Sequence, residues 1–446
     1  MTGPHDITPK SAEIASVQRF SAVRRRATVL CVLVLSASLP VLTTQGVAHA
    51  AGGPNVVQAR SAAVVTLPDA GATLQYVESV ALGQGSWTVT SNATAINFGP
   101  GDYVRCQLDA NGQLMDGGAT TYLADRIAGL VNVGTWKSTA AFTVALVCDH
   151  DSAASYAGQF YFDPGVTLTA VRGGPITSPT VHDTGTPKVV EARTTASVSL
   201  ARQTITPVVS VTLPAGTWAA IGNASLVDFA NGDLVGCYLS VSSGGSITSS
   251  GPEVGVGGYQ ADDIIVAGVA AEATAVIPAA GGVVTMRCSE AYATEVYVDP
   301  GATLTATLVP TRGGHLTQPA RLIALPDLGG SMTNVVSKAM RAGPWRVTTE
   351  VTIGPKNPNG TVGGVNDIVR CALWAGATRI DGGAAILVTV NSALQEIVNA
   401  GTFTATGAWT LRLSCSHDHS ITGGSHWTVF DGMAQGIDKG PIMSTS

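Results

Sequence analysis

One sequence pattern occurs three times along the 446 residues of this chain and limits the fold more than any other feature. Each copy begins with Gly-x-Trp and ends with Asp-x-Val-x-Cys-x-Leu, and the copies span residues 85–108, 216–239 and 343–373. The apolar residues at the end of each copy alternate with a period of two, which is typical of a half-buried strand. The sequence therefore predicts a tandem of three copies of one β-rich repeat.

The spacing within the pattern supports this interpretation. Tryptophan and cysteine are 19 residues apart in the first two copies and 26 apart in the third. The seven extra residues of the third copy include the segment 355–360, whose Pro, Asn and Gly are typical of a turn. We therefore expect the same strands in all three copies, with a longer turn in the third.

Composition favours strands and limits the partners. Charged residues make up 12% of the chain and apolar residues 45%, and Gly, Ala, Val, Thr and Ser suit short strands and turns. Without residues 1–50 the chain keeps 19 basic and 28 acidic residues, a net charge near −9. This acidic balance, with no basic run, argues against nucleic acid or an anionic membrane as the partner.

The first 50 residues have the features of a secretory signal peptide. Three arginines, Arg24 to Arg26, precede an apolar run over 29–42, and Ala48-His49-Ala50 matches the small-x-small cleavage site. We expect a mature, secreted protein that begins at Ala51 and has no membrane span after cleavage, exported by the general secretory route. An uncleaved anchor and twin-arginine export are the alternatives.

Six cysteines follow this leader, two in each repeat. An even number of cysteines in an exported chain indicates disulfides, and six allow fifteen pairings. One internal bond per repeat treats the three copies alike, whereas a metal site would be expected to show Cys-x2-Cys, which is absent. The predicted pairs are Cys106 with Cys148, Cys237 with Cys288, and Cys371 with Cys415.

Other signatures are shared by only two of the repeats. The first and third carry Leu-Pro-Asp before the tryptophan and Asp-Gly-Gly-Ala after the first cysteine, at Asp116 and Asp381. The first and second carry Asp-Pro-Gly, at Asp163 and Asp299, followed by Thr-Leu-Thr-Ala. The first and third repeats are therefore the closer pair, and a Pro-, Thr- and Ser-rich linker separates the first from the second.

Short strands about ten residues apart, with Gly, Pro, Asn and Asp between them, predict an all-β chain. We expect three tandem antiparallel β-sandwich domains, jelly-roll-like, each with one internal disulfide. An immunoglobulin domain is disfavoured because its tryptophan lies between the two cysteines, whereas here it precedes the first. The predicted boundaries are 1–50 for the signal peptide, 51–174 for domain one, 175–187 for the linker, 188–314 for domain two and 315–446 for domain three.

The combination of a signal peptide, Gly-x-Trp, Asp-x-Val-x-Cys-x-Leu and a later apolar strand ending in cysteine resembles uncharacterised secreted proteins of high-GC Gram-positive bacteria. The resemblance covers nearly all of the mature chain. It implies export and a β-sandwich framework, and it supplies no active-site residues.

No catalytic motif of a common enzyme class is present. The sequence contains no Gly-x-Ser-x-Gly, His-Glu-x-x-His, P-loop or dinucleotide-binding glycine pattern. A glycosidase needs two carboxylates in one cleft, but the glutamates are placed differently in the three repeats, and we expect them to be solvated at the surface. These are Glu78, Glu253, Glu272, Glu350 and Glu396. We therefore expect no enzyme activity, no catalytic residue and no cofactor.

One polar position recurs two residues beyond each second cysteine. It is His150, Glu290 and His417, and His419 follows two residues later in the third repeat. Alternate residues of a strand share a face, so His417 and His419, or His150, are candidate metal ligands. The favoured interpretation is a polar turn after a core strand, without metal.

Aromatic residues outside the repeated pattern are the remaining candidates for ligand binding. Trp136, Trp374 and Trp427 have no counterpart at the same offset in the other repeats, and exposed rings can stack on sugars. The alternative is that they fill the local core. The framework tryptophans Trp87 and Trp218, with their third-repeat equivalent Trp345, are expected to pack in the core or at its edge.

Taken together, the sequence predicts a secreted, extracellular or cell-surface protein that is not an enzyme and acts by binding or as a structural component. Cell-wall glycan and another extracellular protein are the partners to consider. The alternatives are a carbohydrate-binding protein that engages cell-wall or environmental polysaccharide, and a secreted hydrolase with an unrecognised site.

Overall fold

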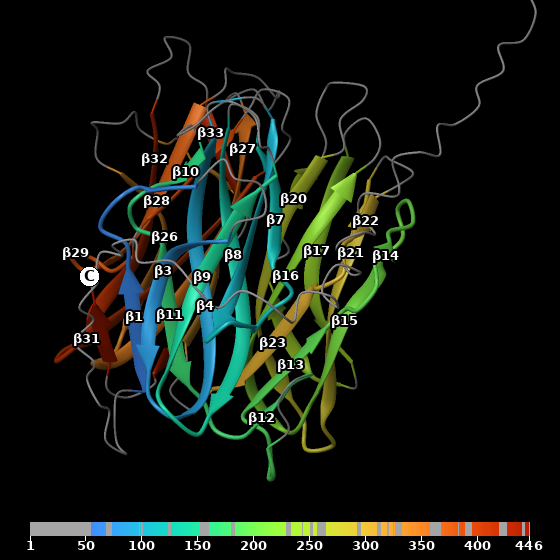
Figure 1. Ribbon diagram of the computed structural model, residues 1–446, viewed down its shortest axis with the longest axis vertical. Coiled ribbons are helices and arrows are strands. Elements are labelled where there is room, and N and C mark those ends of the chain that lie inside the picture. Colours follow the sequence, from blue (N-terminus) through green and yellow to red (C-terminus); the bar gives the residue numbers. More distant parts are fainter. Residues whose placement is uncertain are drawn as a thin grey trace, which may run out of the picture. The chain divides into compact units, whose positions relative to one another are not determined.

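The alternating segments of the sequence form β-strands in the computed structural model, and all the regular secondary structure that it describes is β-strand (Figure 1). The structure describes residues 55–67, 74–97, 99, 101–123, 126–151, 160–179, 183–228, 233–242, 244–249, 253–256, 265–291, 296–309, 314–318, 321–323, 325, 332–356, 367–381, 383–388, 395–418, 426–438 and 442–445. These residues belong to one compact unit, Ala48–Ser446. The predicted signal peptide lies outside them.

The strands follow the three repeats in order. The first repeat contains β1 (Val56–Arg60), β2 (Val65–Thr66), β3 (Gln75–Leu82), β4 (Gly85–Asn97), β5 (Asp102–Ala110), β6 (Gln113–Leu114), β7 (Ala119–Leu123), β8 (Arg126–Ser138), β9 (Phe142–His150), β10 (Phe160–Phe162) and β11 (Thr167–Arg172). After β12 (Ile176–Thr177), the second contains β13 (Val189–Arg193), β14 (Val198–Ser199), β15 (Thr206–Leu213), β16 (Gly216–Asp228), β17 (Asp233–Val241), β18 (Ser246–Ser249), β19 (Glu253–Val256), β20 (Ile265–Ile277), β21 (Gly282–Glu290), β22 (Val296–Val298) and β23 (Thr303–Leu308). The third contains β24 (Gly314–Gln318), β25 (Arg321–Leu322), β26 (Thr333–Met340), β27 (Gly343–Lys356), β28 (Asp367–Ala375), β29 (Thr378–Arg379), β30 (Ala384–Val388), β31 (Gln395–Ala405), β32 (Trp409–His417) and β33 (His426–Asp438), and β34 (Ile442–Thr445) ends the chain.

Each repeat builds two antiparallel sheets. The sheet that carries the repeated tryptophan, here called the tryptophan sheet, is centred on β4, β16 or β27. The sheet that carries both cysteines, here called the cystine sheet, has the order β3-β9-β5-β6, β15-β21-β17-β19 or β26-β32-β28-β29. One apolar core lies between the two sheets of each repeat. The predicted all-β fold of three tandem antiparallel β-sandwiches is therefore confirmed.

The alternation predicted from the sequence is visible in the burial of the strands. In β5 every second residue is buried, and Val104, Cys106 and Leu108 face the core. The indole N–H of Trp87 donates to the carbonyl of Gly83 at 2.9 Å. Trp218 and Trp345 make the same bond to the residue four positions earlier, at 2.9 and 3.0 Å. The framework tryptophans are thus core residues whose polar atom is satisfied by the connection that precedes their strand, between the two sheets of the sandwich.

Three disulfides join the central strands of the cystine sheets, in the pairs predicted. Cys106 lies directly opposite Cys148, Cys237 opposite Cys288, and Cys371 opposite Cys415 in the antiparallel ladders. Their Cα atoms are 4.1, 4.1 and 4.2 Å apart. All six residues are buried, so each bond is internal to one sandwich.

Two short strands connect one repeat to another by parallel pairing. β12, within the predicted linker, pairs with β13, the first strand of the second repeat, and places Ile176 beside Val189. β34, after the third repeat, pairs with β1, the first strand of the first repeat, and places Ile442 beside Val56. Both segments follow a Gly-Pro dipeptide. The end of the chain thus binds the first repeat as the linker binds the second.

Candidate functional site

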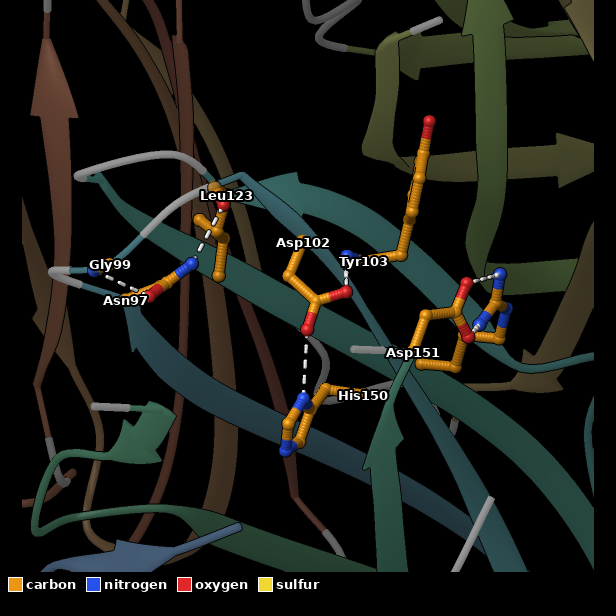
Figure 2. A network of polar contacts seen from close by, with 8 residues as sticks. Asn97, Gly99, Asp102, Tyr103, Leu123, His150 and Asp151 are labelled. Carbon is orange, nitrogen blue, oxygen red and sulfur yellow. Dashed lines mark hydrogen bonds and ion pairs between the residues drawn. The ribbon is translucent and has the colours of Figure 1, made fainter. Parts of the chain in front are cut away.

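In the first repeat, the recurring position beyond the second cysteine contacts the aspartate of Asp-x-Val-x-Cys. His150 Nδ1 lies 2.8 Å from Asp102 Oδ2, and the main-chain N–H of Tyr103 donates to Asp102 Oδ1 at 2.7 Å. Figure 2 shows Asp102 between Tyr103 and His150. Both side chains of this pair are buried, and the imidazole stacks on Phe160 with a centroid separation of 5.2 Å. His150 therefore holds an aspartate in the core of the sandwich.

The second repeat replaces this pair with two carboxyl groups. Asp233 and Glu290 occupy the positions of Asp102 and His150, and both are buried. The pKa of Glu290 is raised to about 7, chiefly by burial and in addition by the neighbouring carboxylate of Asp233. A protonated Glu290 is a possible donor to Asp233, at the place where the first repeat has an imidazole.

The metal hypothesis gains no support from this arrangement. His417 is buried at the same position of the third repeat, and His419 lies outside the described residues. Within the described part of the chain, no three His, Cys, Asp or Glu side chains gather in a way that could hold an ion. His150 and Glu290 are explained as partners of an aspartate in their own repeat.

A surface ion pair recurs beside each of two disulfides. Arg105, directly before Cys106, binds both carboxylate oxygens of Asp151. Arg370, directly before Cys371, binds Asp418 in the same way, with Nη2 2.8 Å from Oδ2. The second repeat has Gly236 at this position. An exposed pair of this kind adds little stability by itself, but both arginines also face another repeat.

The two arginines face the Asp-Pro-Gly turns that the sequence singled out. Arg370 Nη1 of the third repeat lies 3.9 Å from Asp163 Oδ2 of the first. Burial raises the pKa of Asp299 of the second repeat, and the positive charge of Arg105 of the first repeat opposes this rise. The second repeat lacks the arginine, and the third lacks Asp-Pro-Gly. The first–second and third–first junctions are therefore built alike, and the second–third junction differs.

Hydrogen bonds at equivalent positions confirm this likeness. Thr120 N of the first repeat donates to Ser225 Oγ of the second at 3.0 Å, and Ala385 N of the third donates to Thr94 Oγ1 of the first at 3.2 Å. Thr120 and Ala385 each lie four residues after the aspartate of Asp-Gly-Gly-Ala, and the acceptors lie seven residues after a framework tryptophan. The same contact is thus made twice.

The glycines of the Asp-Gly-Gly-Ala turn allow this close approach. A Cβ atom on Gly117 would lie 1.8 Å from the carbonyl oxygen of Gly301, in the Asp-Pro-Gly turn of the second repeat. A side chain at residue 117 would force the two turns apart. The glycines that recur in these signatures therefore belong to the junction between repeats.

The aspartates of the same turns are buried and hold the sheets of their own repeats together. Asp116 accepts from Leu108 N at 3.0 Å and from Asn132 Nδ2 at 2.8 Å. Asp381 accepts from Asn399 Nδ2 at 2.6 Å. Burial raises the pKa of Asp116 to about 6. The Asp-Gly-Gly-Ala signature contains the aspartates, but no sequence pattern connects them with their asparagine partners, Asn132 on β8 and Asn399 on β31.

A buried acid–base pair marks the place where all three repeats meet. Glu272 of the second repeat lies beside Thr348 and Arg346 of the third, and both oppose the rise in its pKa that burial causes. Arg346 Nη2 donates to Thr90 Oγ1 of the first repeat at 2.5 Å. Glu272 is 1% exposed and Arg346 is 4% exposed. The prediction that the glutamates are solvated surface groups was wrong for Glu272, because the repeats cover it.

The three candidate tryptophans differ in their surroundings. Trp136 lies opposite Trp87 and packs against the core, and the registers give it counterparts that simple offsets missed: Phe403 opposite Trp345, and Ala275 opposite Trp218. The side chain of Trp427 lies outside the described part of the structure. Trp374 is half-buried on the outer face of its cystine sheet, where it lines a hollow. Trp374 is therefore placed where a ligand could reach it.

Comparisons with known proteins give no functional assignment. No family model matches the sequence, and no curated protein matches it. Among solved structures, a chain described under "The Triple Jelly Roll Fold and Turret Assembly in an Archaeal Virus" is 10% identical, with 86% of this chain and 92% of that chain covered and a TM-score of 0.18. A likeness at this TM-score carries no argument. The class that the strands and disulfides define is an all-β protein of three sandwiches.

Proposed function

We propose that this chain is a secreted, extracellular or cell-surface protein that is not an enzyme and acts by binding or as a structural component. The observation that carries the proposal is the buried disulfide at the same place in all three sandwiches. Such bonds form and persist in oxidising compartments. The described residues include no helix long and apolar enough to cross a membrane.

The junctions support a structural or binding role. The repeats are joined by matched hydrogen bonds, and the recurring charged and polar groups of the signatures are used within the sandwiches or between them. The recurring residues of the framework therefore hold the sandwiches together and join them to one another. The loops and outer sheet faces, which differ between repeats, are left to present a binding surface.

The experiment is fractionation of the native host with an antibody against the chain, followed by mass spectrometry of the recovered protein. The proposal expects the chain in the medium or the cell-wall fraction, with an N-terminus at Ala51 and all six cysteines of the repeats oxidised. Recovery from the cytosol with the leader intact and the cysteines reduced would contradict it.

Carbohydrate binding is the second candidate function. The observation that favours it is Trp374, a half-buried ring in a hollow of about 190 Å³ with Asn334, Arg412 and Ser414 around it. Aromatic rings beside a few polar groups are typical of small-molecule sites.

A further inference from the structure

The outer face of the third cystine sheet carries two hollows that share a residue. One, of about 320 Å³, lies at the junction with the first repeat and is lined by Asp163, Arg370 and Arg379 among others. The second, of about 190 Å³, is lined by Trp374, Arg412 and Asn334 among others. Met332 lines both hollows, and the two together are here called the β28 groove. The larger hollow has a volume in the range of known ligand sites.

Trp374 is a departure from the repeated framework. It lies three residues after the first cysteine of its repeat, where the other repeats have Asp109 and Ser240. Residues two apart on β28 share a face, so Trp374 lies on the face of Arg370 and Ala372, opposite the core face of Cys371. A large aromatic ring thus stands on an outer face where the sandwich itself needs only a small polar residue.

The indole of Trp374 is also held differently from the framework indoles. The N–H groups of Trp87, Trp218 and Trp345 each donate to a carbonyl four residues earlier. The N–H of Trp374 has no acceptor among the described residues. A covered donor without a partner costs stability, so the fold alone gives no reason for this side chain.

Trp374 stands in a cross-strand row with two cations. Arg379 on β29 and Arg412 on β32 are its direct partners in the antiparallel ladder. Arg379 Nε lies 3.4 Å from Asp381 Oδ1. Arg412 donates to the carbonyl of Gly376, and none of the ion pairs among the described residues includes it. An acidic chain thus places a cation without a described carboxylate partner beside an aromatic platform.

Hydroxyl and amide groups complete the smaller hollow. Ser414 Oγ and Asn334 Oδ1 are hydrogen-bonded at 2.8 Å on β32 and β26. Ser414 is the donor in this bond, so the amide hydrogens of Asn334 and the lone pairs of Ser414 remain suited to sugar hydroxyls. A flat apolar ring, a guanidinium and neutral polar groups together match a pyranose that carries a carboxylate.

We propose that the β28 groove binds an acidic glycan, with a hexuronate ring stacked on Trp374 and its carboxylate paired with Arg412. Asn334 and Ser414 bind the ring hydroxyls, and further sugar units extend toward Arg379 and the junction with the first repeat. This inference rests on the proposed binding role and names its ligand class and its site.

The test is isothermal titration calorimetry of the mature chain, residues 51–446, with tetragalacturonate as the probe and cellotetraose as its neutral counterpart. We expect tetragalacturonate to bind and cellotetraose to bind at least ten-fold more weakly. Trp374→Ala and Arg412→Ala should each weaken binding of tetragalacturonate at least ten-fold, and the contribution of Arg412 should fall as salt is added.

Tyr76→Ala is the matched control. Tyr76 occupies the place of Asn334 in the ladder of the first repeat and is 63% exposed, so its loss tests whether any exposed ring on an outer sheet suffices. We expect this variant to bind as the parent does. The inference is overturned if tetragalacturonate does not bind or if cellotetraose binds with the same affinity. It is also overturned if Trp374→Ala binds tetragalacturonate with unchanged affinity. None of these results bears on export, which the fractionation tests separately.

Discussion

Arg60 Nη1 donates to the main-chain oxygen of Asp381 at 2.6 Å, although 321 residues separate the two along the chain. Arg193, at the end of the equivalent strand of the second repeat, donates to the main-chain oxygen of Met115 in the first. Both acceptors belong to, or directly precede, an Asp-Gly-Gly-Ala turn. The third repeat is therefore attached to the first by the contact that attaches the first to the second, without the covalent linker.

Removal of either guanidinium should destabilise the protein. Arg60→Ala should lower the free energy of unfolding by about 1 to 3 kcal/mol, because a carbonyl covered by the junction loses a charged donor. Arg193→Ala should cost more, because it also leaves Glu191, which is 4% exposed, without the cation 2.6 Å away. Denaturant unfolding followed by circular dichroism measures both values.

Two variants serve as controls for this comparison. Arg341→Ala, at an exposed side chain, should change stability by less than about 0.5 kcal/mol. Glu191→Gln combined with Arg193→Ala should recover part of the loss, since no unpaired charge is then buried. Equal stability of Arg60→Ala and the parent would show that the third–first contact is not formed in solution.

The disulfides should each contribute several kcal/mol. The bond between Cys106 and Cys148 closes a separation of 42 residues, which corresponds to about 4 kcal/mol in the chain-entropy model. Replacing both cysteines with alanine should lower the free energy of unfolding by about that amount. Peptide mapping of the double variant should still show the other two bonds, and any exchange into new pairs would contradict the assignment of one bond per repeat.

The last residues of the chain should protect the first strand. Deletion of residues 440–446 removes β34 and leaves the edge of β1 open, so the amides of Val56 and Gln58, which alternate with those directed at β11, should exchange with solvent at least about ten-fold faster. Hydrogen exchange with mass spectrometry measures this. Deletion of Ser446 alone is the control, and an unchanged rate in the longer deletion would mean that β34 does not pair with β1.

Stability should fall as the pH rises from about 4.5 to about 7. Glu290 has a folded pKa of about 7, above the unfolded value of 4.5, so the folded state holds a proton more tightly. Its contribution is complete below pH 4.5 and is lost between pH 4.5 and 7. Glu290→Gln should therefore raise the melting temperature relative to the parent more at pH 8 than at pH 5. An equal difference at both pH values would contradict the raised pKa.

The fold followed from the sequence because its evidence is periodic. Val104, Cys106 and Leu108 alternate in the sequence and face the core in the structure, and two cysteines in each repeat are enough to predict one internal disulfide per repeat. The role of Glu272 did not follow. A glutamate that faces another repeat has the same local pattern as one that faces water, and only the junction distinguishes them.

The candidate site was predicted in part for a similar reason. His150 and Glu290 were singled out by position, but their partners, Asp102 and Asp233, lie on a different strand, and a ladder register is needed to bring them together. Trp374 was singled out because it had no counterpart. Its hollow also depends on Met332, Asn334 and Arg412, which come from other segments of the same repeat, and no local pattern around Trp374 contains them.

The central claim is that the three sandwiches, each with its own internal disulfide, unfold as one cooperative unit because contacts at their junctions join them. Differential scanning calorimetry of residues 51–446 tests it most directly. The account predicts a single transition whose calorimetric enthalpy equals its van't Hoff enthalpy. Three separable transitions, or a calorimetric enthalpy about three times the van't Hoff value, would show three independent domains and contradict the claim.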